Sequence, residues 1–213
     1  MPAAREALLD AALAALRARP WSGVRMVEVA ASAGVSRQTL HNEFGGKDGL
    51  ARALVRREVE DFLRGAGRLF AECCEGEGGG GGEGAGGGGD GVERCVRLAQ
   101  WTVERVTDRP LLRALLTGCW GERVPLPRAS RGPGPGRLPV DAGPPAPAEL
   151  LAALRTRLGA VPAARAPAAP GGLPPHAYEL AVRLAVSHVL APADEGVPAL
   201  VRSALGAVGR PAR

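Results

Sequence analysis

The stretch that most constrains the fold runs from Met26 to Lys47 and reads MVEVAASAGVSRQTLHNEFGGK. Its apolar residues can close into one small cluster between two short helices that meet at a corner. Gly34 can take the positive φ that such a corner needs, and Ser36 stands where the second helix needs an N-cap. The predicted cluster consists of Val29, Ala30, Ala33, Val35, Leu40 and Phe44.

Inward packing of this second helix would leave a polar set of side chains on its outer side. Leu40 and Phe44 lie four residues apart, so they face the same way. An ordinary helical corner inside a core is the alternative, but the spacing, the corner, the cap and the polar side all agree with a helix-turn-helix. The outward residues have donors and acceptors suited to base edges and phosphates. They are Arg37, Gln38, Thr39, His41 and Asn42.

The segment AGVSRQTLHNEFGGKDGL resembles the AGVS-x-x-TLY-x-x-F-x-x-K-x-x-L signature of the tetracycline-repressor-like (TetR/AcrR) transcriptional regulators. The resemblance covers about residues 5 to 65. It departs at His41, where that family usually carries Tyr, and at the glycine pair before Lys47. The resemblance implies an all-α fold with a three-helix DNA-binding head over residues 1–48. A connecting helix over 49–75 would join the head to a helical effector-binding and dimerisation body over 92–213.

Apolar periodicity and the positions of proline and glycine predict the individual helices. Residues 76–91 are mostly glycine with a few acids, which favours a flexible loop. The Pro-rich segments 124–147 and 161–174 are expected to be irregular. The charged residues between 52 and 61 are expected to form mostly a solvated face of the long fourth helix. Helices are predicted over residues 5–19, 26–33, 37–44, 47–74, 92–107, 110–120, 148–158, 175–190 and 197–208.

The predicted DNA contacts divide into base readers and phosphate ligands. Arg37 can pair with guanine and Gln38 with adenine, and each bidentate contact discriminates between bases by about 1–3 kcal/mol. By the resemblance, Lys47 contacts a phosphate at the start of the fourth helix. Glu43 would repel phosphate, so we expect it to point away or to accept from cytosine N4. The complete predicted set is Arg25, Ser36, Arg37, Gln38, Thr39, His41, Asn42 and Lys47.

The resemblance also implies a homodimer, paired through its last two helices and bound to a palindromic operator in double-stranded DNA. Ordinary packing within one chain is the alternative for those helices. An effector pocket in the body is a further implication, and 3 % aromatic residues would make it mainly aliphatic, suited to a small apolar or amphipathic molecule. Each candidate lining residue has a core role as its alternative. The candidates are Trp101, Arg105, Leu116, Cys119, Trp120, Tyr178, Arg183 and His188.

The composition of the whole chain sets broad limits. The net charge of +5 is compatible with a polyanionic partner without requiring one. The sequence contains neither a long apolar run nor a signal peptide, so we expect a cytoplasmic protein without membrane association. The four cysteines lack metal-binding spacing, which leaves reduced thiols or thiol sensing. We expect no cofactor and no metal.

Four kinds of function can be compared with these features. A ligand-responsive repressor agrees best, and a DNA-binding regulator without a small-molecule effector is the first alternative. An enzyme with a DNA-binding head is a second alternative, but outside the head only His176 and His188 remain, and no catalytic motif surrounds them. A purely structural scaffold would not explain the outward polar set, so we expect no enzymatic activity.

Overall fold

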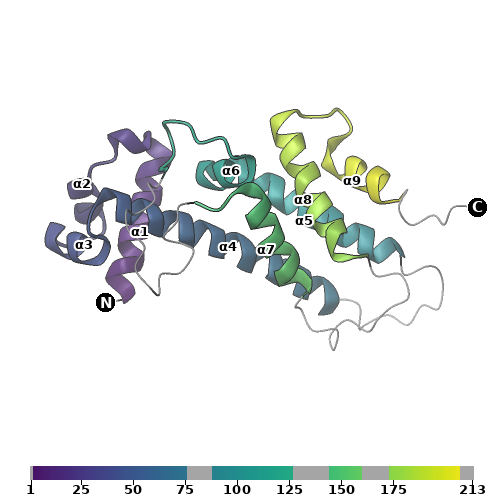
Figure 1. Ribbon diagram of the computed structural model, residues 1–213, viewed down its shortest axis with the longest axis horizontal. Coiled ribbons are helices and arrows are strands. Elements are labelled where there is room, and N and C mark those ends of the chain that lie inside the picture. The colour runs from purple at the N-terminus through teal and green to yellow at the C-terminus, as the bar shows by residue number, and fades with distance from the viewer. Residues whose placement is uncertain (1, 76–87, 127–143, 160–172, 207–213) are drawn as a thin grey trace, which may run out of the picture. The chain divides into compact units, whose positions relative to one another are not determined.

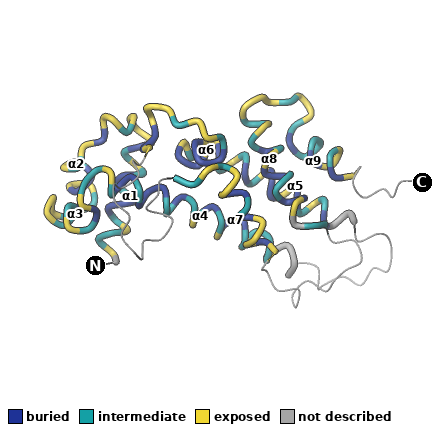
Figure 2. Tube along the Cα trace, in the orientation of Figure 1, coloured by how far each residue is buried: buried dark blue, intermediate teal, exposed yellow. Residues whose placement is uncertain are grey.

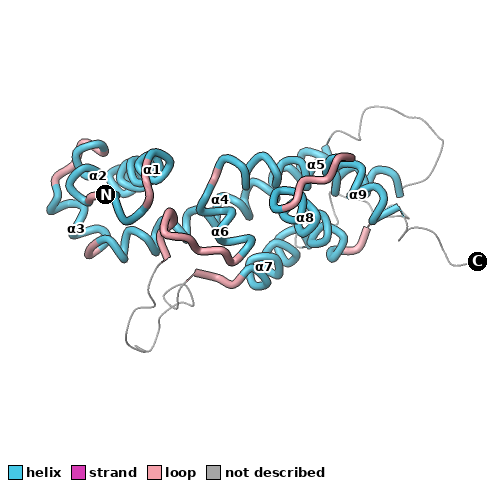
Figure 3. The backbone as a smooth tube through the Cα atoms, turned by 90° about the horizontal axis from the view of Figure 1, so that it is seen from above, coloured by secondary structure: helices cyan, strands magenta, loops and turns pink. Residues whose placement is uncertain are grey.

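The computed structural model describes residues 2–75, 88–126, 144–159 and 173–206 (Figure 1). Within these ranges every regular element is a helix (Figure 3), which confirms the predicted all-α class. The chain divides into two compact units. The first unit comprises Met1–Asp61 with Arg109–Pro147, and the second comprises Phe62–Asp108 with Ala148–Arg213. The expected head over 1–48, connecting helix over 49–75 and body over 92–213 stay a prediction.

The first unit begins with helices whose bounds lie within a few residues of the predicted ones. Pro20 follows the first helix, and the proline ring prevents a helix from continuing through it. A short 3-10 helix then leads to the helix-turn-helix. These elements are α1 (Pro2–Ala18), η1 (Trp21–Gly23), α2 (Met26–Ser32) and α3 (Arg37–Phe44).

Apolar residues repeating at helical spacing build the core of this unit. Leu8 of α1 and Leu40 of α3 are fully buried, as are Leu50 and Leu54 near the start of α4 (Lys47–Glu75). Buried and exposed positions alternate along each helix in Figure 2, as an amphipathic helix requires. The core therefore fixes which face of α3 is turned outward.

Helix α6 (Pro110–Thr117) completes the first unit, and it ends three residues before the predicted Trp120. Gly118 adopts a left-handed φ of 72° and donates its N–H to the Ala114 carbonyl at 2.8 Å, which terminates the helix. Apolar residues continue through Cys119 and Trp120, and for that reason periodicity alone predicts a helix that is too long. Both residues lie beyond the helix.

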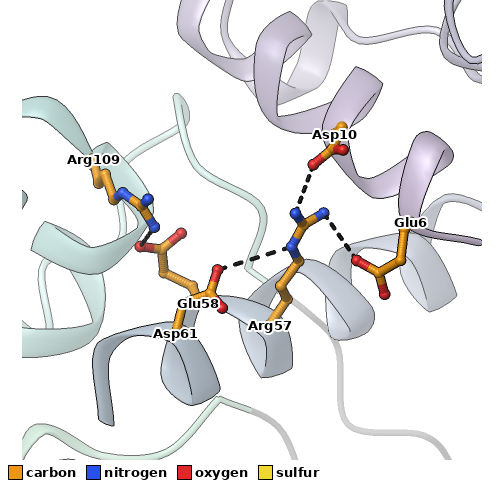
Figure 4. A network of polar contacts seen from close by, with 6 residues as sticks. All are labelled: Glu6, Asp10, Arg57, Glu58, Asp61 and Arg109. Atoms are coloured by element: carbon orange, nitrogen blue, oxygen red, sulfur yellow. Dashed lines mark hydrogen bonds and ion pairs between the residues drawn. The ribbon is translucent and has the colours of Figure 1, made fainter. Parts of the chain in front are cut away.

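A network of charges joins α4 to α1 and to the start of α6 within this unit (Figure 4). Arg57 approaches Asp10 at 2.6 Å, Glu6 at 3.5 Å and Asp61 at 3.9 Å. Glu58 is only 2 % exposed, and its carboxylate accepts from Arg109 Nη1 at 3.1 Å. The expectation of a mostly solvated charged face is therefore wrong at Glu58. A buried carboxylate needs such a partner because desolvation penalises an isolated charge.

The second unit contains the remainder of α4 and four further helices. Helix α5 packs against α8 and α9, and α8 packs against α9. A turn over residues 191–195 joins the last two helices, as predicted. The four helices are α5 (Gly88–Asp108), α7 (Pro147–Gly159, its first residue in the first unit), α8 (Pro175–Leu190) and α9 (Gly196–Gly206).

Aromatic contacts organise the second unit. Phe62 stacks on Trp101 with ring centroids 5.5 Å apart, and Phe70 meets Tyr178 edge-to-face at 5.0 Å. Such pairs add roughly 0.5–1.5 kcal/mol beyond the burial of their area. The few aromatic residues of this unit therefore act mainly as packing anchors.

Helix α5 begins at Gly88, so the last four residues of the predicted glycine-rich loop are helical. The rest of that loop, 76–87, lies outside the described residues, as do 127–143 and 161–172 of the predicted Pro-rich segments. No helix in the described part of the chain is both long and apolar enough to cross a membrane.

Two glycines of α4 allow a matched test of the packing in the second unit. A methyl group added at Gly65 would lie 2.5 Å from Trp101 Cζ2, whereas one added at Gly67 would meet only Arg157, at 3.7 Å. Both substitutions to alanine gain about 1 kcal/mol of helix propensity. Overpacking costs about 1–3 kcal/mol, so we expect Gly65→Ala to be less stable than Gly67→Ala by that amount. Urea unfolding followed by circular dichroism measures the difference, and equal stabilities would contradict the packing.

Candidate nucleic-acid interface

Helices α2 and α3 meet at a tight corner built on Gly34. Gly34 has a φ of 68°, and an added Cβ would meet no atom within 4 Å. Backbone conformation, not space, therefore favours glycine here. The Val35 N–H donates to the Ala30 carbonyl at 3.0 Å and closes the corner. The positive-φ corner predicted from the sequence is confirmed.

Ser36 is the N-cap of α3, as predicted. Its extended backbone (φ −72°, ψ 153°) precedes the first helical turn, and its Oγ accepts from the Thr39 N–H at 3.0 Å. The Thr39 hydroxyl lies 2.8 Å from the same oxygen. Both hydroxyls therefore make contacts at the N-terminus of α3. A phosphate or base contact by either hydroxyl stays a prediction.

The two apolar residues of α3 set its orientation. Leu40 is 0 % and Phe44 8 % exposed; Val29 and Ala30 of α2, the helix that contacts α3, are also buried. The other two members of the predicted cluster, Ala33 and Val35, are only half-buried.

The opposite side of α3 presents polar groups. Arg37, Gln38 and Asn42 are exposed, whereas Thr39 and His41 are half-buried. Gln38 Nε2 donates to Asn42 Oδ1 at 2.9 Å, one helical turn away. The amide pair and the guanidinium thus form a compact donor and acceptor surface around the first two turns.

Lys47 begins α4 after a connector of two glycines. Gly45 has a left-handed φ of 68° and donates its N–H to the His41 carbonyl at 2.8 Å, which ends α3. Lys47 Nζ donates to the Ser22 carbonyl at 3.2 Å and lies 5.2 Å from the centre of the Trp21 ring. Partial burial lowers the pKa of this ammonium group below its usual value. The lysine thus fixes the segment before α2, and its phosphate contact stays a prediction.

Arg25, the residue just before α2, is strongly exposed. Its side chain is 76 % accessible, and Nη1 lies 3.9 Å from Glu28 Oε1. Arg19 of the loop after α1 pairs with the same carboxylate. The loose Arg25 contact leaves its guanidinium able to turn toward an anion.

The acidic member of α3 has a partner that the sequence analysis missed. Arg5 Nη1 lies 3.7 Å from Glu43 Oε2 and donates to the Glu43 carbonyl at 3.5 Å. The same guanidinium lies over the Phe44 ring, 4.7 Å from its centre. Nothing local in the sequence signals this pairing, because the two residues are 38 positions apart.

The eight predicted effector residues are divided between the two units. Leu116, Cys119 and Trp120 belong to the first unit, and the other five belong to the second. Several already have partners within their own unit. Arg105 lies 5.2 Å from the centre of the Trp101 ring, and His188 Nδ1 accepts from the Ala193 N–H at 3.3 Å. Arg183 and Arg155 both pair with Glu179, at 2.7 and 3.1 Å; Tyr178 packs on Phe70.

None of these eight residues lines a cavity that is described below. A cavity of about 10 Å³ in the second unit has room for about one water molecule. It is lined by Ala66, Leu69, Phe70, Arg94, Leu98 and Leu158. Two larger hollows of about 270 and 530 Å³ lie in the first unit, and none of the eight residues lines either of them.

The two cysteines whose side chains are described differ in environment. Cys95 is buried, and desolvation raises the pKa of its thiol to about 12, which suppresses the reactive thiolate. Cys119 is exposed beyond the end of α6. The side chains of Cys73 and Cys74 lie outside the described residues.

Comparison with known proteins agrees with this helix-turn-helix. Residues 8–54 match the family model described as bacterial regulatory proteins, tetR family. Over 53 residues the chain is 45 % identical to the HTH-type transcriptional regulator AlkX of Mycobacterium tuberculosis, a match covering 25 % of each protein. The chain thus aligns with about a quarter of that curated relative.

Two solved structures were also compared. A tetR-family transcriptional regulator from Streptomyces coelicolor has a TM-score of 0.53 and 22 % identity, over 98 % of this chain and 82 % of that one. This likeness supports the fold. The TetR family repressor AlkX from Dietzia sp. strain DQ12-45-1b has a TM-score of 0.47 and 19 % identity, over 95 % and 93 % of the two chains.

The N-cap of α3 can be tested by itself. Ser36→Ala removes the oxygen that accepts from the Thr39 N–H, so we expect it to lower the free energy of unfolding by about 1 kcal/mol. Ser36→Asn is the matched control, because asparagine caps about as well as serine and should restore most of the loss. Chemical denaturation of the three proteins measures both effects. Equal stability of Ser36→Ala and the unaltered protein would contradict the capping role.

Proposed function

We propose that this chain, whose residues 8–54 match the tetR family model of bacterial regulatory proteins, is a member of that family. We propose that it binds double-stranded DNA sequence-specifically and represses transcription. One observation carries the proposal. Leu40 and Phe44 are buried on one side of α3, while Arg37, Gln38 and Asn42 are exposed on the other. This arrangement presents donors and acceptors to a partner instead of to the core.

The size and polarity of α3 suit the major groove of DNA. A helix with its side chains is about 10–12 Å across, comparable with the width of that groove. Arg37 stands at the first turn, where recognition helices place their base contacts. Its fork of donors matches guanine O6 and N7, and the amides of Gln38 and Asn42 match adenine N6 and N7.

Phosphate contacts would come from the residues around α3. Lys47 carries its cation at the first residue of α4, near N–H groups that have no intrahelical partner. Arg25 stands at the first residue before α2 and is strongly exposed. These contacts would give affinity and salt dependence without selecting a sequence.

Substitutions of Arg37 and Lys47 separate the two kinds of contact. Arg37→Ala should relax sequence preference at one base pair by about 1–3 kcal/mol. Lys47→Ala should weaken binding to all sequences and lower the salt slope by about 1. Selection from a random duplex pool, followed by titrations at several salt concentrations, measures both effects.

Arg37→Lys is the matched control, because it keeps the charge but lacks the planar fork of arginine. It should therefore lose preference while keeping most of the salt slope. Equal losses of affinity with unchanged preference in the Arg37→Ala and Lys47→Ala variants would contradict this division of roles. Failure of the unaltered protein to enrich any sequence would overturn the proposed function.

We propose further that the protein acts as a symmetric dimer on a palindromic operator. One α3 reads only a few base pairs, and a two-fold axis doubles the site. Within a single chain, α8 and α9 leave several apolar side chains only partly covered, and Leu190 is 54 % exposed. A second copy of these helices would cover them. The partly covered residues are Leu180, Leu184, Val186, Val189 and Leu200.

Dimerisation predicts a mass of two chains in light scattering at micromolar concentration. Leu190→Arg places a charge among these apolar side chains, so we expect it to shift the equilibrium toward the monomer. Leu126→Arg is the matched control, because Leu126 is 57 % exposed but belongs to the first unit. A stable monomer of the unaltered protein would contradict the dimer.

Response to a small effector stays a prediction. An effector and the operator would have to weaken each other's binding by the same factor. A DNA-binding regulator without a small-molecule effector is the second candidate. Release of the protein from its selected duplex by a small apolar compound would favour the first candidate over the second.

A further inference from the structure

We propose that Arg5 of α1 is a positioning residue for DNA binding, which neutralises Glu43 on the DNA-facing helix and holds the last turn of that helix. This inference rests on the proposed function. Arg5 itself is not assigned a contact with DNA. It acts through Glu43 and Phe44, the last two residues of α3.

Three contacts of one guanidinium group support this role. Arg5 Nη1 lies 3.7 Å from Glu43 Oε2 and 3.5 Å from the Glu43 carbonyl oxygen, and Arg5 Cζ lies 4.7 Å from the centre of the Phe44 ring. The side chains of Arg5 and Glu43 are 37 % and 24 % exposed, so both are partly withdrawn from water. The contacts therefore form one compact cluster across α1 and α3.

The contacts of Arg5 with the Glu43 carbonyl and the Phe44 ring stabilise the last turn of α3. The final carbonyls of a helix have no intrahelical partner, and the Arg5 donor meets one of them. A cation at a helix C-terminus is also favoured by the helix dipole. The face of an aromatic ring attracts a guanidinium, so Arg5 and the buried Phe44 hold each other in place.

The pairing of Arg5 with Glu43 affects the charge that α3 presents to DNA. In α3, whose sequence is RQTLHNEF, Glu43 is the single acidic residue, and it directly follows the exposed Asn42. An uncompensated carboxylate there would repel the phosphates that flank the groove. With Arg5 beside it, the end of α3 presents a paired charge to the DNA instead of a net negative one.

A double-mutant cycle tests the proposal. Arg5→Met removes the charge but keeps an unbranched side chain over Phe44, and Glu43→Gln removes the opposing charge. Affinities are measured for the duplex selected from the random pool and for a random-sequence duplex, at several salt concentrations. We expect Arg5→Met to bind both duplexes about tenfold more weakly, within the usual range for interacting pairs. Glu43→Gln should bind at least as tightly as the unaltered protein.

The combined variant distinguishes charge neutralisation from other roles. Arg5→Met with Glu43→Gln should bind within about threefold of the unaltered protein and keep its salt slope, because no phosphate ligand has been removed. Persistent weakness of the combined variant, with a reduced slope, would show that Arg5 contacts phosphate directly and would overturn the proposal. Persistent weakness with an unchanged slope would show a structural role alone and would overturn it equally.

Two further variants serve as controls. Arg17→Met removes the same charge from an exposed position of the same helix and should leave affinity within about twofold. Arg5→Lys keeps a cation beside Glu43 and should bind within about threefold of the unaltered protein. An Arg5→Lys variant as weak as Arg5→Met would overturn the charge argument, even if Arg5→Met itself folded poorly. Absence of DNA binding by the unaltered protein would instead overturn the proposed function, and the inference with it.

Discussion

Burial of Leu40 and Phe44 is the constraint on which the proposed interface depends. Each side chain contributes roughly 1.5–3 kcal/mol by leaving water, far more than any exposed polar contact on the same helix. Turning α3 about its axis would expose both and bury charged or amide groups without partners. Burial of this apolar pair therefore sets the orientation of α3, and that orientation turns Arg37 and Gln38 outward.

The pairing of the buried Glu58 with the partly exposed Arg109 connects α6 to the N-terminal helices of the first unit. Removing a carboxylate from water costs several kcal/mol, and a hydrogen-bonded guanidinium offsets that cost only if it is held in place. Arg109 directly precedes α6, where Pro110 suits the first helical position. The ion pair thus joins the start of α6 to α4, so any movement of one against the other would leave a charge buried without its partner.

Local features of this fold could be predicted from the sequence, whereas its long-range pairings could not. Gly34 and Ser36 were predictable because φ preference and capping act over four residues or fewer. Arg109 pairs with Glu58 across 51 positions, and no spacing rule connects them. The residue types of the effector candidates carry no information about which side chains meet, and the candidates lie in both units. In α6, apolar residues continue beyond the last helical residue, because Gly118 in the left-handed conformation ends the helix.

The contacts around α3 also bear on how the proposed interface would discriminate between sequences. Ser36 fixes the first turn, Arg5 contacts the last turn, and Lys47 ties the start of α4 to the segment before α2. A helix held at both ends loses little conformational freedom on binding, so less interaction energy is needed to order it. Differences in affinity between DNA sequences would then arise from the exposed tips of Arg37 and Gln38, and not from rearrangement of the backbone that carries them.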